Sequence, residues 1–488
     1  MRRVVLSCLI CGCGRIGFAP EDHGALTLSY PTHAIYAVVN ASTIAVAPTV
    51  SDTAARFTID PALPAALYFD PETGAIRGTP VTTVEQTYTV TARTAGAAAT
   101  ATFSLTALPG YIVDTTADAA DANDGGDATC ATAAGPCSLR AAIQTTNHLA
   151  AKQLVLLESA TYRLGAALDP IANDVVIAGQ GAGASVIRAT TAHGGYAALA
   201  LASNHLLALR DLAIDDFGGA DGGALGVTAG TLDVDRCTFT NNASPTSGGV
   251  LFINGGAHAQ LANSTFTGNA SLGGNGGGWG GVIDGEDAGT EIVVTTSTAT
   301  ENTTAWGSFS HITTGTTLRL ENSTLYGNTS TTAGTLATPG GIYTLVNDTI
   351  VGNVNTTTDS AGIYLFSAPC HYTITNTIVA FNRDSAGEHD CNRRDLTTTI
   401  DSGGGNILGD AGANCAAYFT APGDRLMTDP GLVSGAPADN GGATATLLLA
   451  ADSVAIDTAG AAACPATDQR GLPRPVGVGC DVGAIEMQ

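Results

Sequence analysis

Two acidic clusters are the first places where this sequence could support chemistry. Asp215 and Asp216 are neighbours in the chain, and Asp284, Glu286 and Asp287 form a second cluster. Two carboxyl groups at a suitable separation can cleave a glycosidic bond, one as acid and the other as base or nucleophile. Solvated turns have the same composition, and we favour that interpretation for both clusters. No catalytic residue is therefore assigned, and Asp215 and Asp216 are kept as the weak alternative.

The two tryptophans are candidates for carbohydrate stacking. Trp279 and Trp306 lie 27 residues apart. An indole has a broad flat face and one polar N–H, so two indoles side by side could form a platform for sugar rings. A mutually packed aromatic pair is the alternative. The histidines of the central region occur singly and are expected at surface or ladder positions: His193, His205, His258, His311, His371 and His389.

The charge balance argues against nucleic acid as a partner. The chain has 19 basic and 43 acidic residues, for a net charge of −24, whereas phosphate binding requires a basic face. Polysaccharide lyases need a basic residue that removes a proton, often beside acids that hold Ca²⁺. Between residues 170 and 380 the only basic side chains besides histidine are those of Arg188, Arg210, Arg236 and Arg319, and none is assigned to such a site.

No cofactor is expected from the sequence. Asp121, Asp124 and Asp127 lie in a short acidic run, and carboxylate oxygens are the ligands that Ca²⁺ prefers. A soluble acidic linker is the favoured interpretation of the same run. Ca²⁺ binding by this run is the alternative, and no metal site is assigned.

A repeated phrase predicts the elements that must position these residues. Its closing asparagines are separated by 27, 33, 26, 25 and 29 residues, at Asn242, Asn269, Asn302, Asn328, Asn353 and Asn382. A period in the twenties indicates stacked units that cannot bury a core alone. We expect an all-β fold: a right-handed single-stranded parallel β-helix over residues 152–408, with about ten coils. The asparagines should form an amide ladder and adopt the left-handed bend conformation.

The chain before the β-helix is predicted to hold an export signal and a small domain. Residues 1–12 have a charged start and a short apolar run, and Cys13 follows in a sequence that resembles a bacterial lipobox. The resemblance implies a lipid on Cys13, a tether over 13–23 and a location on the outer membrane or cell surface of a Gram-negative bacterium. The membrane is then a partner through the lipid.

Residues 24–108 alternate polar and apolar residues, which is the period of β-strands. Within them, residues 63–80 resemble the signature of Ig-like or cadherin-like modules of bacterial surface proteins, which implies a small Ig-like β-sandwich that acts as a spacer. Residues 109–137 are read as an acidic linker. Residues 138–151 lack Gly and Pro and are expected to form a helix that caps the β-helix.

Several segments resemble exported bacterial β-helix proteins. Residues 137–143 are similar to the "CSLREA" segment, although Ala141 replaces its glutamate. Phe239 and Asn242, with Gly222 and Gly223 before them, are similar to the repeats of polymorphic outer-membrane adhesins. Residues 409–488 resemble the choice-of-anchor Q module, with Asp468 and Arg470 as an expected structural ion pair. These resemblances imply a surface protein.

The cysteines beyond Cys13 are expected to form disulfides, because an exported protein meets an oxidising environment. Three pairs are close in sequence: Cys130 with Cys137, Cys391 with Cys415, and Cys464 with Cys480. Cys237 and Cys370 remain, either as buried free thiols or with Cys370 competing for Cys391.

Three functions are consistent with the sequence. The favoured one is a lipid-anchored surface protein with an adhesive or structural β-helix and no catalysis. A carbohydrate-active β-helix enzyme, such as a polysaccharide lyase or glycoside hydrolase, is the first alternative. A glycan-binding module that uses Trp279 and Trp306 is the second, and the expected ligands are polysaccharides or other cell-surface molecules.

Overall fold

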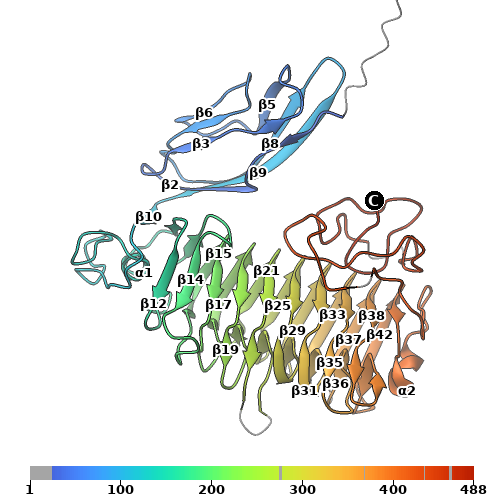
Figure 1. Cartoon of the computed structure of the whole chain (residues 1–488). Coiled ribbons are helices and arrows are strands. Elements are labelled where there is room, and N and C mark those ends of the chain that lie inside the picture. The colour runs from blue at the N-terminus through green and yellow to red at the C-terminus, as the bar shows by residue number, and fades with distance from the viewer. Residues whose placement is uncertain (1–24, 274–276, 368, 434, 461–463) are drawn as a thin grey trace, which may run out of the picture. The chain divides into compact units, whose positions relative to one another are not determined.

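The computed structural model describes residues 25–488 apart from 274–276, 368, 434 and 461–463 (Figure 1). The chain forms two compact units, Met1–Ala107 and Leu108–Gln488. Cys13 and the expected leader and tether lie outside the described residues. None of the helices in the described part of the chain has the length and apolar character needed to cross a membrane.

The first unit is a small antiparallel β-sandwich. Its two main sheets have the strand orders β2-β9-β8-β5 and β3-β7-β6, and β1 pairs with β4. The strands are β1 Leu28–Ser29, β2 Ala34–Val38, β3 Ile44–Val46, β4 Thr49–Val50, β5 Arg56–Asp60, β6 Leu67–Phe69, β7 Ile76–Gly78, β8 Val84–Arg93 and β9 Ala98–Leu108. Alternate residues of β8 and β9 point into the core, where the rings of Tyr88 and Phe103 stack with centroids 5.5 Å apart.

The second unit is a parallel β-solenoid of about nine turns, against the ten or so expected. From β20 to β39 each coil gives two strands to a 17-stranded sheet, one to a ten-stranded sheet and one to a seven-stranded sheet. The 17-stranded sheet contains β10 Gly110–Val113, β11 Gln153–Leu157, β13 Val175–Ala178, β15 Leu199–Arg210, β17 Leu225–Asp235, β20 Leu251–Ile253, β21 His258–Ala262, β24 Ile283–Gly285, β25 Glu291–Thr295, β28 Ser310–Ile312, β29 Thr317–Glu321, β32 Leu336–Thr338, β33 Ile342–Val346, β36 Ile363–Leu365, β37 His371–Thr375, β41 Cys391–Arg393 and β42 Thr399–Gly404.

The other two sheets complete each coil. The ten-stranded sheet contains β12 Thr161–Leu164, β14 Val186–Ala189, β16 Ala213–Asp215, β18 Thr238–Thr240, β22 Thr265–Thr267, β26 Thr298–Thr300, β30 Thr324–Tyr326, β34 Thr349–Val351, β38 Ile378–Ala380 and β43 Ile407–Leu408. The seven-stranded sheet contains β19 Ala243–Ser244, β23 Ala270–Ser271, β27 Thr303–Trp306, β31 Thr329–Ala333, β35 Val354–Asn355, β39 Arg383–Asp384 and β40 Gly387–Glu388.

The predicted amide ladder is present inside the β-helix. The sixth closing asparagine, Asn382, donates to Asp390, and the first five each donate from Nδ2 to Oδ1 of the asparagine on the next coil, as Asn302 does to Asn328 at 2.8 Å. The backbone N–H of Asn302 donates to the same oxygen at 3.0 Å. All six asparagines have 0% exposure. Every coil thereby satisfies its buried amide with the coil beside it, which is what a buried polar group requires.

The expected left-handed conformation of these asparagines is wrong by one residue. The positive φ belongs to the residue before each of them, for example 66° at Gly268 and 65° at Gly327. The physical reason is that the asparagine side chain must point into the interior, so the preceding residue makes the bend. Glycine is favoured there because it has no Cβ to clash in this conformation.

A second buried ladder runs along the neighbouring corner. The backbone N–H of Ser264 donates to Oγ of Ser297 at 3.2 Å, and that of Ser297 donates to Oγ of Ser323 at 3.2 Å. The backbone N–H of Cys237 donates to Oγ of Ser264 at 3.1 Å. Cys237 therefore occupies a serine position of the repeat, which explains a buried free thiol at this place.

The cysteines pair as the close spacings suggested. Disulfides join Cys130 to Cys137, Cys391 to Cys415 and Cys464 to Cys480. Cys237 and Cys370 are both buried and free, so Cys370 does not compete for Cys391.

A helix and a loop-rich module flank the coils. The helix α1 covers Leu139–Asn147, shorter than the expected 138–151, and Ser138 caps it by accepting the N–H of Ala141 at 3.0 Å. Its buried face, formed by Leu139, Ala142 and Ile143, belongs to the core that the first strands share. The short helix α2 (Gly412–Cys415) and a 3₁₀ turn over Ala416–Tyr418 follow the last strand.

The remaining C-terminal residues lie along the ten-stranded sheet (Figure 1). Gln469 anchors them, because its side chain accepts from Oγ1 of Thr324 at 2.6 Å and donates to Oγ1 of Thr298 at 2.8 Å. Arg470 pairs with Asp468 at 2.7 Å, and both side chains are buried. The expected structural ion pair is thus present, and it joins parts of the C-terminal segment, since Arg470 also donates to the Glu486 carbonyl.

Candidate functional site

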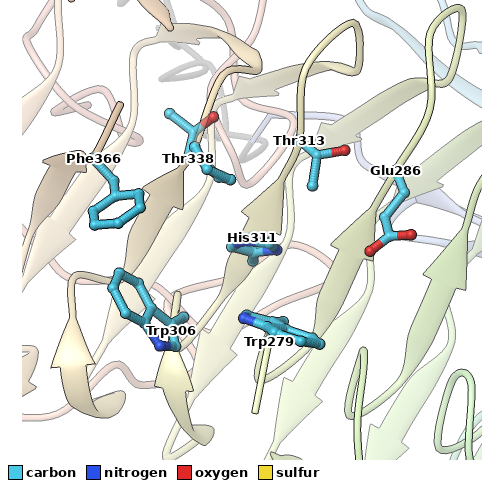
Figure 2. A pocket seen from close by; sticks show the side chains of 8 residues that line it. Trp279, Glu286, Trp306, His311, Thr313, Thr338 and Phe366 are labelled. Carbon is cyan, nitrogen blue, oxygen red and sulfur yellow. The ribbon is translucent and has the colours of Figure 1, made fainter. Parts of the chain in front are cut away.

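An open cleft of about 390 Å³ lies where the seven-stranded sheet meets the row β24, β28, β32 and β36 of the 17-stranded sheet. Residues from four successive coils line it (Figure 2). They are Trp279, Glu286, Trp306, His311, Thr313, Thr338, Pro339 and Phe366.

The β-helix brings the two tryptophans together. Trp279 and Trp306 pair through a parallel β-bridge between successive coils. Each is followed by a glycine with positive φ, 63° at Gly280 and 69° at Gly307. A Cβ at these glycines would lie 1.9 Å and 2.1 Å from a carbonyl oxygen, so only glycine fits the bend that directs each indole. The repeat thus places equivalent side chains one coil apart.

The aromatic side chains form the main walls of the cleft. The Trp279 ring stacks on the His311 ring with centroids 6.1 Å apart and planes at 25°. The Trp306 ring meets Phe366 edge-on at 5.0 Å and 71°. Figure 2 shows Trp306 and Phe366 at one end of the cleft and Glu286 at the other. Trp279 is 38% exposed, so part of its indole ring faces the solvent.

A buried carboxylate orients the histidine of the cleft. Asp284 and His311 are register partners on β24 and β28, and the Asp284 Oδ1 lies 2.8 Å from His311 Nδ1. Asp284 has 0% exposure, and within the described chain no hydrogen-bond donor reaches its Oδ2. When Nδ1 carries the hydrogen, the neutral imidazole keeps Nε2 as its acceptor.

Glu286 supplies the acidic end of the cleft. Burial raises the pKa of the Glu286 carboxyl, and the negative charges of Asp284, Asp287 and Asp221 raise it further, while His311 opposes them. The expectation of a solvated acidic turn is wrong for Asp284, which has 0% exposure, whereas Glu286 is half-buried at the edge of the cleft. The cause is strand register, because His311 on the next coil pairs with Asp284 and lies 2.8 Å from its carboxylate.

The other acidic pair is not part of this site. Asp215 ends β16 on the ten-stranded sheet, and its Oδ2 accepts from Arg188 at 2.6 Å. Asp216 lies 3.5 Å from the same guanidinium. Burial raises the pKa of Asp215, and Arg188 opposes that shift. The structure thus places Asp215 and Asp216 in an ion-pair cluster around one arginine.

The acidic run before the first coils is organised by backbone donors. Asp121 accepts from the N–H groups of Asn123, Gly125 and Ala131 at 2.8, 2.9 and 3.0 Å. Asp127 accepts from the side chain of Asn123. Across the residues that the structure describes, no group of three His, Cys, Asp or Glu side chains is placed to hold a metal ion.

Sequence reasoning singled out the tryptophans and missed the Asp284–His311 pair. The signal was in the sequence, because Asp284 and His311 are also 27 residues apart, the same spacing as Trp279 and Trp306. Two chemically distinctive residues at one coil spacing are register partners in a parallel β-helix. The histidine was read as isolated because its partner lies one coil away.

Residues 25–108 match the family described as "Putative Ig domain". No curated protein matches the chain. Among solved structures, the chain is similar to a pectin methylesterase from carrot, with 11% identity, a TM-score of 0.25, and 58% of this chain and 83% of that chain covered. It is also similar to a family 28 exopolygalacturonase from Yersinia enterocolitica, with 12% identity, a TM-score of 0.27, and 83% and 86% covered. At this level of similarity neither enzyme assigns a function to the cleft.

Proposed function

We propose that this protein is an exported, lipid-anchored surface protein whose β-helix binds a glycan in the cleft of Trp279 and Trp306. The observation that carries the proposal is the placement of two indoles on successive coils beside an open, mostly aromatic cavity. Aromatic walls with a few polar groups at the edges are the usual composition of small-molecule sites. Sugar rings present both an apolar face and a polar edge to such walls.

The anchor is the lipid on Cys13, supported by the lipobox-like sequence around it. The Ig-like unit acts as a spacer between the membrane and the β-helix, and the adhesive role follows from glycan binding at a surface. A Cys13→Ser variant tests the anchor. We expect it to leave the membrane fraction and appear in the soluble fraction, and continued membrane attachment would contradict the lipid.

Binding is tested with purified protein against a panel of neutral, basic and acidic polysaccharides. Trp279→Ala and Trp306→Ala should each weaken binding by about tenfold, because packing on one aromatic contributes about 0.5–1.5 kcal/mol beyond the area that it buries, and about 1.4 kcal/mol is tenfold in affinity. Tyr68→Ala is the matched control, because Tyr68 is an aromatic side chain of the first unit with 60% exposure. Equal binding by the tryptophan variants and the native protein would sink the proposal.

A carbohydrate-active enzyme is the second candidate function. The specific observation in its favour is a histidine oriented by a buried aspartate, with Glu286 at the same cleft. General acid–base catalysis requires such a positioned pair. The same polysaccharide panel is therefore scored for cleavage. Reproducible cleavage that disappears in His311→Asn while folding is retained would replace the binding function with an enzymatic one.

A further inference from the structure

We infer that the cleft selects glycans that carry ammonium groups, such as oligomers of unacetylated amino sugars, over glycans made of uronic acids. The inference rests on the proposed glycan-binding function and names the ligand class of that same site. Two features carry it: the sign of the charges around the cavity, and the aromatic faces beside the acidic end.

The charges closest to the acidic end of the cleft, where Glu286 lies, are negative. Glu286 lines the cavity, and Asp284 lies beneath His311 with no exposed surface. Asp287 and Asp221 act on Glu286 with the same sign. Because a buried carboxylate is poorly screened by water, its field extends further than that of a surface acid. A uronate placed here would meet repulsion, and an ammonium would meet attraction.

The positive groups near the cavity do not reverse this sign. His311 is held by Asp284 through Nδ1. The Arg394 guanidinium lies over the Phe366 ring, 4.9 Å from its centroid, at the aromatic end. Burial raises the pKa of Tyr364 to about 12. The charge of Asp359 adds to this shift, and the charge of Arg394 opposes it. The Arg394 guanidinium thus lies beside Phe366, at the opposite end of the cleft from Glu286.

The aromatic walls also favour a cation. The face of an indole attracts ammonium groups through its ring quadrupole, and Trp is the strongest side chain in this respect. Trp279 lies between the acidic end and Trp306 in Figure 2. A sugar bound against Trp279 can therefore place an amino substituent near Glu286 while its ring contacts the indole.

The pH dependence of binding follows from the same groups. Glu286 must be ionised to attract the ammonium, and burial raises the pKa of its carboxyl, so affinity should fall as pH decreases and Glu286 takes up a proton. Affinity should also fall as pH rises and the amino sugar loses its charge. A maximum between the two is expected for the ammonium-bearing ligand, and no such maximum is expected for its N-acetylated form.

The test compares three oligosaccharides of equal length by titration calorimetry at mildly acidic pH: glucosamine, N-acetylglucosamine and galacturonate oligomers. The native protein should bind the glucosamine oligomer best. Glu286→Gln should weaken that binding by about tenfold, the size of a charge-assisted contact, and leave the N-acetylated oligomer unchanged. Glu291→Gln is the matched control, because Glu291 is a 61% exposed carboxylate on the neighbouring strand β25.

The outcomes separate this inference from the proposed function. If all three oligomers bind equally, or galacturonate binds best, and Trp279→Ala abolishes that binding, the glycan-binding function stands and the selectivity for ammonium groups is overturned. If no oligosaccharide binds, both are overturned. Unchanged thermal unfolding of Glu286→Gln shows that a loss of binding does not come from misfolding.

Discussion

The asparagine ladder inside the β-helix and the cleft on its surface use polar residues in opposite ways. The ladder repeats one residue on six coils, and each amide is satisfied by its neighbours. The cleft uses Trp, His, Asp and Glu once or twice each, and it leaves Asp284 Oδ2 without a donor from the described chain. Repetition with full satisfaction marks a structural role, whereas departure from the repeat with an unsatisfied group marks a site that can interact with a ligand.

The comparison predicts that ladder changes alter stability and that cleft changes alter binding. The largest effect is expected for Asn302→Ala. It removes the acceptor of Asn269, whose N–H and Nδ2 donate to Asn302 Oδ1 at 2.9 and 3.0 Å. Leaving two buried donors unpaired should lower the free energy of unfolding by about 3–5 kcal/mol. Chemical denaturation measures this change in the free energy of unfolding.

The control for this change is Asn414→Ala, because Asn414 is exposed and makes two long hydrogen bonds of 3.4 Å. It should alter the free energy of unfolding by less than about 0.5 kcal/mol. Similar effects of the two variants would contradict a structural role for the ladder.

A smaller effect is expected at the end of the ladder, where Asp390 accepts from Asn382 Nδ2 at 2.7 Å. Burial raises the pKa of Asp390 to about 8, with Glu388 adding to the shift and the donors opposing it. Because the folded pKa lies above the unfolded one, the stability from this group is complete at acidic pH. It is lost as pH rises through about 8.

The measurement is the free energy of unfolding against pH for the native protein and Asp390→Asn. The native protein should lose about 1–3 kcal/mol more than the variant between acidic and mildly alkaline pH. Other buried acids titrate in both proteins and cancel in the difference. Parallel curves for the two proteins would show that Asp390 is ionised throughout.

Trp279→Ala tests whether a residue of the cleft contributes to stability. Trp279 is 38% exposed and contacts His311 at its ring face, so its removal should change the free energy of unfolding by no more than about 1 kcal/mol. Thermal and chemical unfolding measure this beside the loss of glycan binding. A large loss of stability would instead make Trp279 part of the structural core.

The smallest effect is expected for Cys237→Ser in the second ladder. The serines of this ladder donate to the carbonyl two residues earlier, as Ser264 does to Ala262 at 2.6 Å. Cys237 Sγ lies 3.5 Å from the Asp235 carbonyl in the same arrangement. The introduced hydroxyl can make the same bond, so stability should change by less than about 0.5 kcal/mol. Cys237→Val, which removes the donor, should be the less stable of the two.

The repeat made much of the fold predictable. The closing asparagines indicated the coils, the ladder and the location of the β-helix, because identical side chains stacked one coil apart can satisfy one another's buried amides. The predicted position of the left-handed bend was wrong by one residue. The repeat shows which residue recurs on each coil, but it does not show which residue adopts a positive φ. Gly268 and Gly327, directly before Asn269 and Asn328, were the available signal.

The candidate site was predictable only in part. Trp279 and Trp306 were selected because their spacing of 27 residues is about one coil and because an indole has a broad flat face. The roles of Asp284 and Glu286 were missed, because a short acidic segment has the same sequence whether it is solvated or covered. Asp215 was an equally plausible candidate for a functional acid by composition. In the structure it forms an ion pair with Arg188 of the preceding coil.

The amino-acid sequence by itself determined that the chain stacks into parallel coils, because the spacing of its glycines and asparagines is a local property repeated along the chain. It also favoured the three cysteine pairs that are close in sequence, while the tertiary structure decided that Cys391 pairs with Cys415 and that Cys370 is free. Only the tertiary structure decided which polar residues meet across coils. A residue such as His311 acquires its partner through strand register, so its burial, its hydrogen bond to Asp284 and its place beside Trp279 arise only when the coils stack.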